Sequence, residues 1–460
     1  MQGPDEATED QAAFDKSLSF LAEFTDYEQK HALTLKRESL DLGRMRDIAA
    51  AVNNPEAQTP FIHIAGSKGK GSATMITEAL LRGQGLSTGR FLSPHLVDVT
   101  ERIAIDGKPV SHREFARLTD QLRPLVESHR SSNPEKLPSF FESITIMSFL
   151  AFAQAKVDVA IVETGLGGRL DATNIIDPLV SVITMIDKEH TRVLGDTLPE
   201  IAGEKAGIIK ENRSVISGED RDGPAGQRIA KIAAERNAPS QWLGHEFSIQ
   251  NVASDQMKQT FDFCHPQLNL NGLQVGILGR HQLDNVALAL AAVIETAATG
   301  LFTLNTDAIR ATLATLALPA RVEFFPKHSG SLALESAVLL DSAHTPKSMA
   351  ALAATITTSF PNQNRALLVG LLKDKDVEKC LGAVNGLFTK IMVTEPESPR
   401  ALPAQELVKG IRKVMGADVD IEILPHWANL KKSALISFDL LVVTGSVYLA
   451  GSIRPSLCPV

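Results

Sequence analysis

The feature that most constrains the fold is a strand, loop and helix pattern at residues 61–72, which read FIHIAGSKGKGS. Residues 61–65 form an apolar run that predicts a buried strand, and Ala73 to Leu81 predict a helix. The loop between them carries three glycines and two lysines. Glycines let the backbone turn so that successive N–H groups point into one concavity, and the helix N-terminus adds partial positive charge. The pattern therefore predicts a loop that binds phosphate groups.

This loop departs from the strict Walker spacing. That spacing has a glycine where this chain has Ile64, and a serine or threonine where it has Gly71. We interpret it as a shortened phosphate loop in which Lys70 places a full charge beside the phosphates and Ser72 adds a hydroxyl group. An ordinary glycine-rich turn would also join a strand to a helix, but the two lysines favour a phosphate site.

Composition places the chain among ordinary globular proteins. Its 460 residues are 44% hydrophobic and 22% charged, enough for two or three domains with a large core. The net charge of -8 and the lack of a basic stripe argue against a nucleic-acid partner. No uncharged apolar run reaches the roughly 18 residues of a membrane span, and the acidic N-terminus shows no signal peptide. Three widely spaced cysteines suit reduced thiols in the cytoplasm.

The order of predicted strands and helices indicates an α/β protein with two domains. We place a P-loop ATPase-like domain with a parallel sheet over residues 1–318, and a smaller Rossmann-like α/β domain over residues 319–460. The largely apolar runs 157–162 and 179–186 suit central parallel strands that are buried on both faces. Residues 1–14 are expected to be frayed. The active site is expected in the cleft between the domains, because such clefts are common ligand sites.

Polar residues follow the predicted strands at their carboxyl ends, where ligands bind in open α/β sheets. Glu163 follows one apolar run, and Asp187 follows the next, shortly before His190. A carboxylate beside a phosphate loop is a ligand that Mg²⁺ prefers, and an imidazole would supplement oxygen ligands at a second ion. Considered alone, Glu163 could also be a helix cap or a salt-bridge partner, and His190 a structural histidine.

Other residues also have a functional and a structural interpretation. Pro94 holds Ser93 extended, which suits a loop residue whose hydroxyl group faces outward. Lys205 alone would be interpreted as a solvated helix lysine. Residues 341–344 end the first strand of the second domain, where they form either a buried cap or part of the inter-domain site.

Taken together, these segments resemble the folylpolyglutamate synthase and dihydrofolate synthase family within the wider Mur ligase group. The matching segments run in order from about residue 40 to residue 454. Beyond the phosphate loop and the segments at Ser93 and Glu163, they comprise 204–208, 279–285, 341–344, 374–376, 398–403 and 444–446.

The resemblance implies an ATP-dependent ligase that joins L-glutamate to a folate-type carboxylate, either dihydropteroate or a reduced folate. ATP would phosphorylate the carboxylate, and the glutamate amine would attack the acyl phosphate and release phosphate. The acyl phosphate is needed because a carboxylate oxygen is a poor leaving group at neutral pH. Such a site must neutralise charge on the phosphoryl oxygens and hold the reactants aligned.

The resemblance also implies roles for individual residues. The residues expected to act in catalysis are Lys70, Glu163, His190 and Lys205. The residues expected to bind ATP are Gly66, Gly69, Lys70, Gly71, Ser72, Asn285, Arg321 and Asp341. The expected ligands of two Mg²⁺ ions are Ser93 and Glu163 for one ion and His190 for the other. Lys205 is expected to carry a carbamate, the adduct of its amine with CO₂. The expected substrate contacts are Phe141 and Asp171 for the pterin, and His344 and Ser446 for glutamate.

Three positions depart from the pattern of the family that the chain resembles. Lys68 stands where many members have asparagine, which adds charge to the phosphate loop. Glu189 replaces the usual aspartate before His190, and its longer arm could shift the histidine. Thr345 replaces the usual asparagine after His344, at the site of the second domain.

Two other functions remain open from the sequence. One is a Mur-type ligase that acts on a cell-wall precursor, although Phe141, Asp171 and residues 398–403 argue against it. The other is a nucleotide-binding homologue without catalysis, which the intact metal and phosphate residues argue against. The sequence does not decide between dihydrofolate synthesis, polyglutamate extension and both. We expect a monomer whose partners are small molecules.

Overall fold

A computed structural model describes residues 4–26, 40–132, 137–430 and 437–458 of the chain. The chain divides into two compact units, and each has its own β-sheet. The first unit comprises Met1–Gln250, Phe263–Asn271 and Asp284–Thr312, and the second comprises Asn251–Asp262, Gly272–Leu283 and Leu313–Val460. The predicted α/β class with two sheet domains is confirmed. The predicted boundary at residue 318 stays a prediction.

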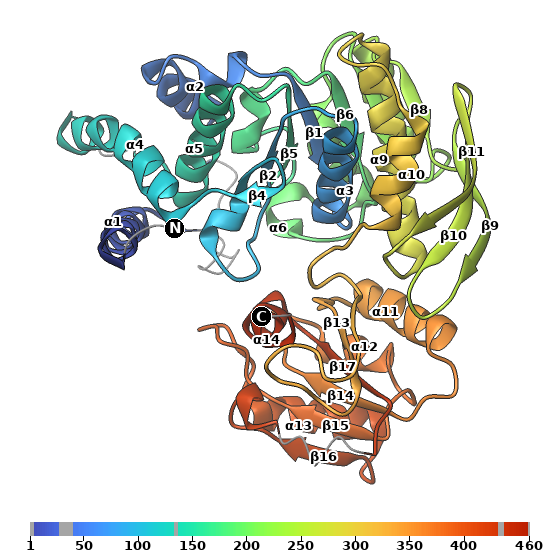
Figure 1. Ribbon diagram of the computed structural model, residues 1–460. Helices are drawn as coiled ribbons and strands as arrows, with labels where there is room; N and C mark the ends of the chain where they lie inside the picture. The colour runs from blue at the N-terminus through green and yellow to red at the C-terminus, as the bar shows by residue number, and fades with distance from the viewer. Residues whose placement is uncertain (1–3, 27–39, 133–136, 431–436, 459–460) are drawn as a thin grey trace. The chain divides into compact units, whose positions relative to one another are not determined.

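The first unit is built on an eight-stranded sheet with the order β4-β3-β2-β5-β1-β6-β7-β8. Strand β1 (Phe61–Ala65) lies in its middle, parallel to β5 (Val159–Glu163) on one side and β6 (Val180–Ile183) on the other (Figure 1). All residues of these three strands are buried, which explains their largely apolar sequences. Because the strands are parallel, the segments that follow them meet at one edge of the sheet.

The outer strands extend this sheet on both sides. Strands β2 (Thr88–Phe91), β7 (Ser214–Ser217) and β8 (Ser240–Trp242) continue the parallel pairing. The short strands β3 (Ile103–Ile105) and β4 (Lys108–Pro109) pair antiparallel at one edge. Helix α3 (Lys70–Gly83) follows the phosphate loop and packs on β1, β2 and β5.

Two apolar cores support the first sheet. One includes side chains of β1, β2 and β5 and of the helices α1 (Pro4–Ala22), α2 (Leu42–Ala51), α4 (His112–Ser132) and α5 (Phe140–Ala155). The other joins β6, β7 and β8 to α6 (Thr191–Leu194), α7 (Leu198–Lys205) and α8 (Pro224–Glu235). The short helices of this unit are η2 (Pro55–Ala57), η3 (Val99–Arg102), η5 (Ala172–Ile175) and η6 (Ala206–Ile208).

The N-terminal segment differs from the sequence prediction. Residues 1–14 were expected to be frayed, but α1 begins at Pro4, so the expectation is wrong for residues 4–14. Phe14 stacks on His112 of α4 with ring centroids 3.8 Å apart, and His112 Nδ1 is 3.0 Å from Gln11 Oε1. This packing gives the polar first turns of α1 a tertiary partner that the sequence pattern does not reveal.

A three-stranded sheet, one long helix and one shorter helix complete the middle of the chain. The sheet has the order β11-β10-β9, with β9 (Ser248–Ser254), β10 (Gln259–His265) and β11 (Leu268–Val275). Burial alternates along β10, as expected for a sheet with one buried face. The helices are α9 (Arg280–Ala298) and α10 (Thr306–Ala314).

The second unit is built on a six-stranded sheet with the order β12-β13-β17-β14-β15-β16. All neighbours in it are parallel except β12 and β13. Its strands are β12 (Glu323–Phe325), β13 (Ala337–Leu340), β14 (Arg365–Val369), β15 (Lys390–Val393), β16 (Asp420–Ile423) and β17 (Leu440–Thr444). Its helices are α11 (Pro346–Ser359), α12 (Val377–Gly382), α13 (Ala404–Met415), the short η7 (Trp427–Asn429) and α14 (Val447–Leu457).

Candidate active site

The phosphate loop needs glycine at two positions. Gly69 immediately precedes α3 with φ of 88°, and a Cβ atom there would lie 2.3 Å from Asn285 Oδ1. A Cβ atom on Gly66 would lie 1.8 Å from Thr184 Oγ1. Both distances are far shorter than a carbon–oxygen contact, so a side chain at either position would displace the neighbouring residue. The structure therefore brings Asn285, a predicted ATP contact, against the loop.

The segment after β6 holds the loop in place. The Ser67 backbone N–H donates to the Met185 carbonyl over 2.8 Å. The Ser67 hydroxyl group donates to the Asp187 carbonyl over 3.0 Å and accepts from the Asp187 N–H over 2.9 Å. Thr184 Oγ1 donates to the Lys68 carbonyl over 2.6 Å. These hydrogen bonds hold the loop against the segment that follows β6.

Two lysines converge on one carbonyl oxygen of the loop. Lys70 Nζ donates to the Gly66 carbonyl over 3.0 Å, and Lys205 Nζ donates to the same oxygen over 2.8 Å. The side chain of Lys205 is only 1% exposed, so the interpretation as a solvated helix lysine is wrong. Two ammonium groups this close to the start of α3 give the loop the positive charge that a phosphate ligand needs.

Glu163 and Ser93 lie together beside Lys70. Glu163 ends β5 and is 4% exposed, and its Oε2 accepts from the Ser93 N–H over 3.3 Å. Its Oε1 is 4.0 Å from Lys70 Nζ. A buried carboxylate next to a serine at the end of a strand fits Mg²⁺, which prefers oxygen ligands. The ion pair with Lys70 is compatible with the structural interpretation as well, so the metal role stays a prediction.

Glu189 lies beside the phosphate loop, immediately before His190. Its Oε1 is 2.9 Å from Lys205 Nζ, and its Oε2 is 3.6 Å from Lys68 Nζ. Burial opposes the charged carboxylate, but Lys205, Lys70 and Lys68 outweigh burial and lower the pKa of Glu189 to about 2. His190 is exposed and immediately precedes α6 as its N-cap residue, with φ of 45°. It therefore lies next to Glu189, which contacts Lys205 and Lys68.

Burial makes Lys205 easier to deprotonate. Its pKa is lowered to about 8 chiefly by burial, although the Glu189 carboxylate partly restores the charged form. Lys70 and Lys68 contribute further lowering because they are like charges. A larger fraction of the Lys205 amine is therefore neutral near pH 7 than in an exposed lysine.

The two predicted pterin residues have different surroundings. Phe141 is half-buried with its ring against Gly165, where a Cβ atom would lie 2.5 Å from the ring. Asp171 is 3% exposed and accepts hydrogen bonds from Leu166 N and from Thr173 N and Oγ1. Burial raises the pKa of Asp171, while these bonds and Lys70 oppose that rise. Asp171 thus caps η5, and its predicted contact with the pterin stays a prediction.

His63 is a buried residue of this site that the sequence interpretation missed. Its Nε2 is 2.8 Å from Thr173 Oγ1, which in turn donates to Asp171 over 2.5 Å. Thr173 uses its only hydroxyl hydrogen on Asp171, so His63 must donate through Nε2. Burial, with a smaller effect of Lys210, lowers the pKa of His63 to about 3. The signal in the sequence that could have identified this residue was a histidine inside a run predicted to form a buried strand.

Four predicted residues of the second unit cluster around one strand end. Asp341 accepts from Val322 N over 2.8 Å and Ala343 N over 2.7 Å, and Arg321 donates to Ser342 Oγ. Burial raises the pKa of Asp341, and Arg321 opposes that rise.

The other two members are His344, three residues after Asp341, and Ser446, which follows β17 and is far away in the chain. His344 Nδ1 is 2.8 Å from the Ser342 carbonyl, and Ser446 caps α14 by accepting from Leu449 N over 3.0 Å. Gly445 N donates to the Ala343 carbonyl over 2.9 Å, which joins the two loops. The hydrogen bonds of Asp341 and Ser446 are those of structural caps, and their ligand roles stay predictions.

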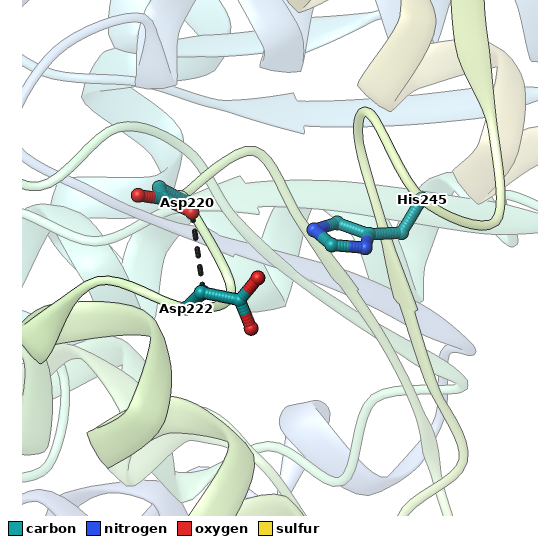
Figure 2. Close-up of side chains that lie close together, drawn as sticks. All are labelled: Asp220, Asp222 and His245. Atoms are coloured by element: carbon teal, nitrogen blue, oxygen red, sulfur yellow. Dashed lines mark hydrogen bonds between the residues drawn. The ribbon is translucent and has the colours of Figure 1, made fainter.

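A second cluster of ionisable residues lies away from the phosphate loop in sequence. Figure 2 shows Asp220, Asp222 and His245, whose potential ligand atoms lie within 4.8 Å of one another. All three residues are exposed, and Asp222 N donates to Asp220 Oδ1 over 3.2 Å. Exposed acidic groups often lie together without an ion, so we assign the cluster no ligand.

Comparison with known proteins agrees with this architecture. Residues 64–293 match the Mur ligase middle domain, and residues 320–447 match the Mur ligase, glutamate ligase domain. The dihydrofolate synthase/folylpolyglutamate synthase of Bacillus subtilis (strain 168) is 32% identical over 421 residues, which cover 90% of this chain and 94% of the relative.

Solved structures also resemble this chain along nearly its whole length. The Mycobacterium tuberculosis folylpolyglutamate synthase complexed with ADP has 30% identity and a TM-score of 0.85, covering 97% of this chain and 98% of the other. An FPGS-AMPPCP-folate complex has 26% identity and a TM-score of 0.79, and the match covers 96% of this chain and 99% of the other. None of the described helices is long and apolar enough to cross a membrane.

The phosphate loop, the two α/β sheets and the two matched domains define the class as Mur-type ligases. Within that class, the chain belongs to the folylpolyglutamate synthase/dihydrofolate synthase family.

Proposed function

We propose that this protein is an ATP-dependent ligase that joins L-glutamate to a folate-type carboxylate through an acyl phosphate. It would act as a folylpolyglutamate synthase, a dihydrofolate synthase or both. The observation that carries the proposal is the convergence of Lys70 and Lys205 on the Gly66 carbonyl, next to Glu163 and Ser93, in a chain of this family. Relatives that bind ADP, or an ATP analogue with folate, support the same substrates.

The residues of the phosphate loop would bind and orient the triphosphate. Lys70 lies at the N-terminus of α3, so its charge and the helix dipole act on the same phosphate oxygens. Gly66, Gly69, Gly71 and Ser72 would provide the close backbone approach and a hydroxyl group, and Asn285 would border the loop. The enzyme thereby holds the transferred phosphoryl group in line with the folate carboxylate.

We propose that two Mg²⁺ ions bind here, with Ser93 and Glu163 as ligands of one ion and His190 of the other. When bound, Mg²⁺ supplies positive charge that neutralises the phosphoryl oxygens. The buried carboxylate of Glu163 and its contact with Ser93 N suit such an ion. Lys70, Glu163, His190 and Lys205 are the proposed catalytic residues.

Lys205 is proposed to carry a carbamate. Its neutral amine would attack CO₂, forming a nitrogen–carbon bond, and the nitrogen would lose a proton to solvent. The modification replaces a cation by an anion, which suits a site for metal ions. The pKa of about 8 supports this step, because only the neutral amine is nucleophilic.

Further roles are proposed as the resemblance implies them. Phe141 and Asp171 would bind the pterin, His344 and Ser446 the glutamate, and Arg321 and Asp341 the nucleotide. The corresponding domains would be residues 1–318 and 319–460. We propose a cytoplasmic monomer without nucleic-acid or membrane partners. All three cysteines, Cys264, Cys380 and Cys458, are free thiols, which suits a reducing compartment.

Mass analysis of the products tests the proposed function. The protein is incubated with ATP, L-glutamate and either dihydropteroate or tetrahydrofolate. We expect a product enlarged by glutamate, and phosphate release that needs both glutamate and the pteroate compound. A product from dihydropteroate alone identifies a dihydrofolate synthase, and one from tetrahydrofolate alone identifies a folylpolyglutamate synthase.

Two other outcomes would replace the proposal. Phosphate release with a nucleotide-linked cell-wall precursor, and not with either folate, would point to a Mur-type ligase, which the two Mur ligase domain matches keep as the alternative. Nucleotide binding without turnover on any of these acids would point to a homologue that has lost catalysis.

A further inference from the structure

Three buried side chains, which we call the His63 network, connect the middle strand of the first sheet to Asp171. His63 Nε2 is 2.8 Å from Thr173 Oγ1, and Thr173 Oγ1 donates to Asp171 Oδ1 over 2.5 Å. His63 and Thr173 are 0% exposed, and Asp171 is 3% exposed. The cap of η5 needs only the hydrogen bond from Thr173 N to Asp171, so the cap does not explain why a polar ring lies in an otherwise apolar strand.

The number of hydrogen atoms sets the direction of the His63 network. Burial lowers the pKa of His63 to about 3, so the ring is neutral near pH 7 and carries a single N–H group. Among the described residues, His63 Nδ1 has no hydrogen-bond partner. A hydrogen on Nδ1 would therefore be an unpaired buried donor, whereas a hydrogen on Nε2 is donated to Thr173. Thr173 then has Asp171 as the acceptor for its own hydroxyl hydrogen.

The carboxylate of Asp171 is linked in turn to the aromatic ring of Phe141. Leu166 N donates to Asp171 Oδ2 over 2.7 Å. The preceding residue, Gly165, lies so close to Phe141 that a Cβ atom there would be 2.5 Å from the ring. Phe141, Gly165 and Leu166 are partly exposed, whereas the histidine end of the network is buried. The contacts therefore lead from the interior of the first unit to a ring that a ligand can reach.

We propose that His63 and Thr173 are positioning residues for the pterin part of the substrate. His63 directs the hydroxyl hydrogen of Thr173 to Asp171 Oδ1, so the carboxylate keeps one orientation. Oδ1 accepts two hydrogen bonds and Oδ2 only one, so Oδ2 keeps the capacity to accept an N–H of the pterin. This role rests on the proposed function, which gives Phe141 and Asp171 to the pterin and assigns nothing to His63 or Thr173.

The network makes recognition depend on N–H groups at the edge of a flat ring. A pterin is a flat heterocycle with N–H donors on its edge, so its face suits Phe141 and its edge suits an acceptor such as Asp171. A carboxylate that three donors already hold loses little freedom when a ligand binds, which lowers the cost of binding. A ring without an N–H edge would leave Oδ2 short of a donor and would bind more weakly.

Thr173→Val breaks the network at its centre while it preserves the shape of the side chain. Asp171 then loses a donor, and His63 loses its acceptor. We expect the KM for the pterin substrate, dihydropteroate or tetrahydrofolate, to rise about tenfold, as for one lost hydrogen bond to a charged group. The kcat and the KM for ATP should change less than about twofold, because the pterin lies at the opposite end of the substrate from the carboxylate that reacts.

Variants of His63 test whether this residue acts through Thr173. His63→Leu removes the donor and should raise the KM for the pterin substrate about threefold, because Thr173 can still donate to Asp171. His63→Gln keeps a donor and should restore this KM to within about twofold of the unsubstituted protein. Added to Thr173→Val, His63→Leu should have no further effect, because the network is already broken.

Thr119→Val is the matched control. Thr119 is 0% exposed on α4 in the same unit, and its hydroxyl group donates to the Phe115 carbonyl over 2.9 Å. The variant removes the same buried hydroxyl group outside the network, so we expect each KM to stay unchanged. Circular dichroism shows whether each variant is folded. If Thr173→Val does not fold, the comparison of His63→Leu with His63→Gln carries the test.

The position of the hydrogen on His63 gives a measurement that needs no turnover. Two-dimensional nitrogen NMR of the histidine rings distinguishes a nitrogen that carries a hydrogen from one that does not, and the signals lost in His63→Gln belong to His63. We expect the hydrogen on Nε2. A hydrogen on Nδ1 would mean that His63 does not donate to Thr173, which would overturn the proposed direction of the network.

The kinetic outcomes separate this role from the proposed function. In an enzyme that makes the glutamate adduct, an unchanged KM for the pterin substrate in Thr173→Val would overturn only the positioning role. A fall in kcat together with a rise in the KM of every substrate would do the same, because it would indicate general damage to the site. An unsubstituted protein that uses neither dihydropteroate nor tetrahydrofolate would overturn the proposed function, and the pterin role with it.

Discussion

At the scale of single residues, the site is a dense arrangement of opposite charges. Lys70 and Lys205 share the Gly66 carbonyl, and the carboxylates of Glu163 and Glu189 lie within 4.0 Å and 2.9 Å of them, respectively. Charges that are this poorly solvated interact strongly, so removing one changes the protonation and orientation of the others. Substitutions here should therefore change the chemistry of the site.

Lys70→Ala and Glu163→Ala should each remove turnover while the protein stays folded. Lys70 is expected to neutralise the phosphates, and Glu163 to hold a metal ion, so we expect kcat to fall by about 10² to 10³. Phosphate release measures turnover, and circular dichroism measures folding. Near-normal kcat in either folded variant would contradict the role assigned to that residue.

Acid should destabilise the protein through His63. Its pKa is about 3 in the folded protein and 6.5 when unperturbed, so the unfolded chain binds the extra proton between these values. The contribution of His63 to the free energy of unfolding is fully present above pH 6.5 and falls by about 1.4 kcal/mol for each pH unit below it. Urea unfolding from pH 7 to 4 measures the slope.

His63→Gln is the variant for this measurement, because its amide can still donate to Thr173. It should unfold with a shallower pH dependence than the unsubstituted protein. His281, whose pKa is lowered to about 4 by burial and by Arg321, would account for part of the slope that remains. An identical slope in both proteins would refute the assignment to His63.

At the scale of elements, the order of strands assembles the site. Glu163 is the last residue of β5 and Glu189 comes after β6, and these strands do not pair with each other but lie on either side of β1. The phosphate loop follows β1, so it receives carboxylates from both sides. Helix α3 then begins at Lys70 and directs its N-terminus to the same edge.

Two glycines have nearly the same backbone angle φ but different surroundings, so substituting each one distinguishes the effect of backbone strain from the effect of contact with a neighbouring side chain. Gly69 has φ of 88° with Asn285 Oδ1 in the space of a Cβ atom, whereas Gly85 has φ of 89° with nothing within 4 Å. Alanine at either position costs about 1 kcal/mol of backbone strain. Only Gly69→Ala should also displace Asn285 and weaken ADP binding. Thermal melting and ADP titration of both variants measure the two effects, and equal ADP affinity would show that the crowding is harmless.

At the scale of the whole molecule, the chain forms two units that each carry a sheet and an apolar core. A ligand that binds only the folded form stabilises the unit that contains its site. The phosphate loop and its carboxylates all belong to the first unit. Nucleotide should therefore delay the unfolding of that unit.

ADP should raise the temperature at which the first unit unfolds. At a concentration of about 100 times Kd, the stabilisation is about 2.7 kcal/mol. Scanning calorimetry with and without ADP measures the shift, and Lys70→Ala, which would lose the proposed phosphate contact, should show a smaller one. An equal shift in the variant would mean that ADP binds elsewhere.

The sequence by itself determined the elements whose signals are local. The phosphate loop was predicted from the glycines and lysines between a strand and a helix. The α/β class was predicted from the apolar runs of β5 and β6 and from the strand–helix alternation that begins again at β13. Both predictions were possible because turn residues and strands buried on both faces produce patterns in consecutive residues.

Only the tertiary structure decided which distant residues meet. It placed β1 between β5 and β6, buried Lys205 against the Gly66 carbonyl, and joined Glu189 to Lys68 and Lys205. It also extended α1 to Pro4 through packing against α4. Strand order and side-chain burial depend on contacts between residues far apart in the chain, and no local pattern encodes them.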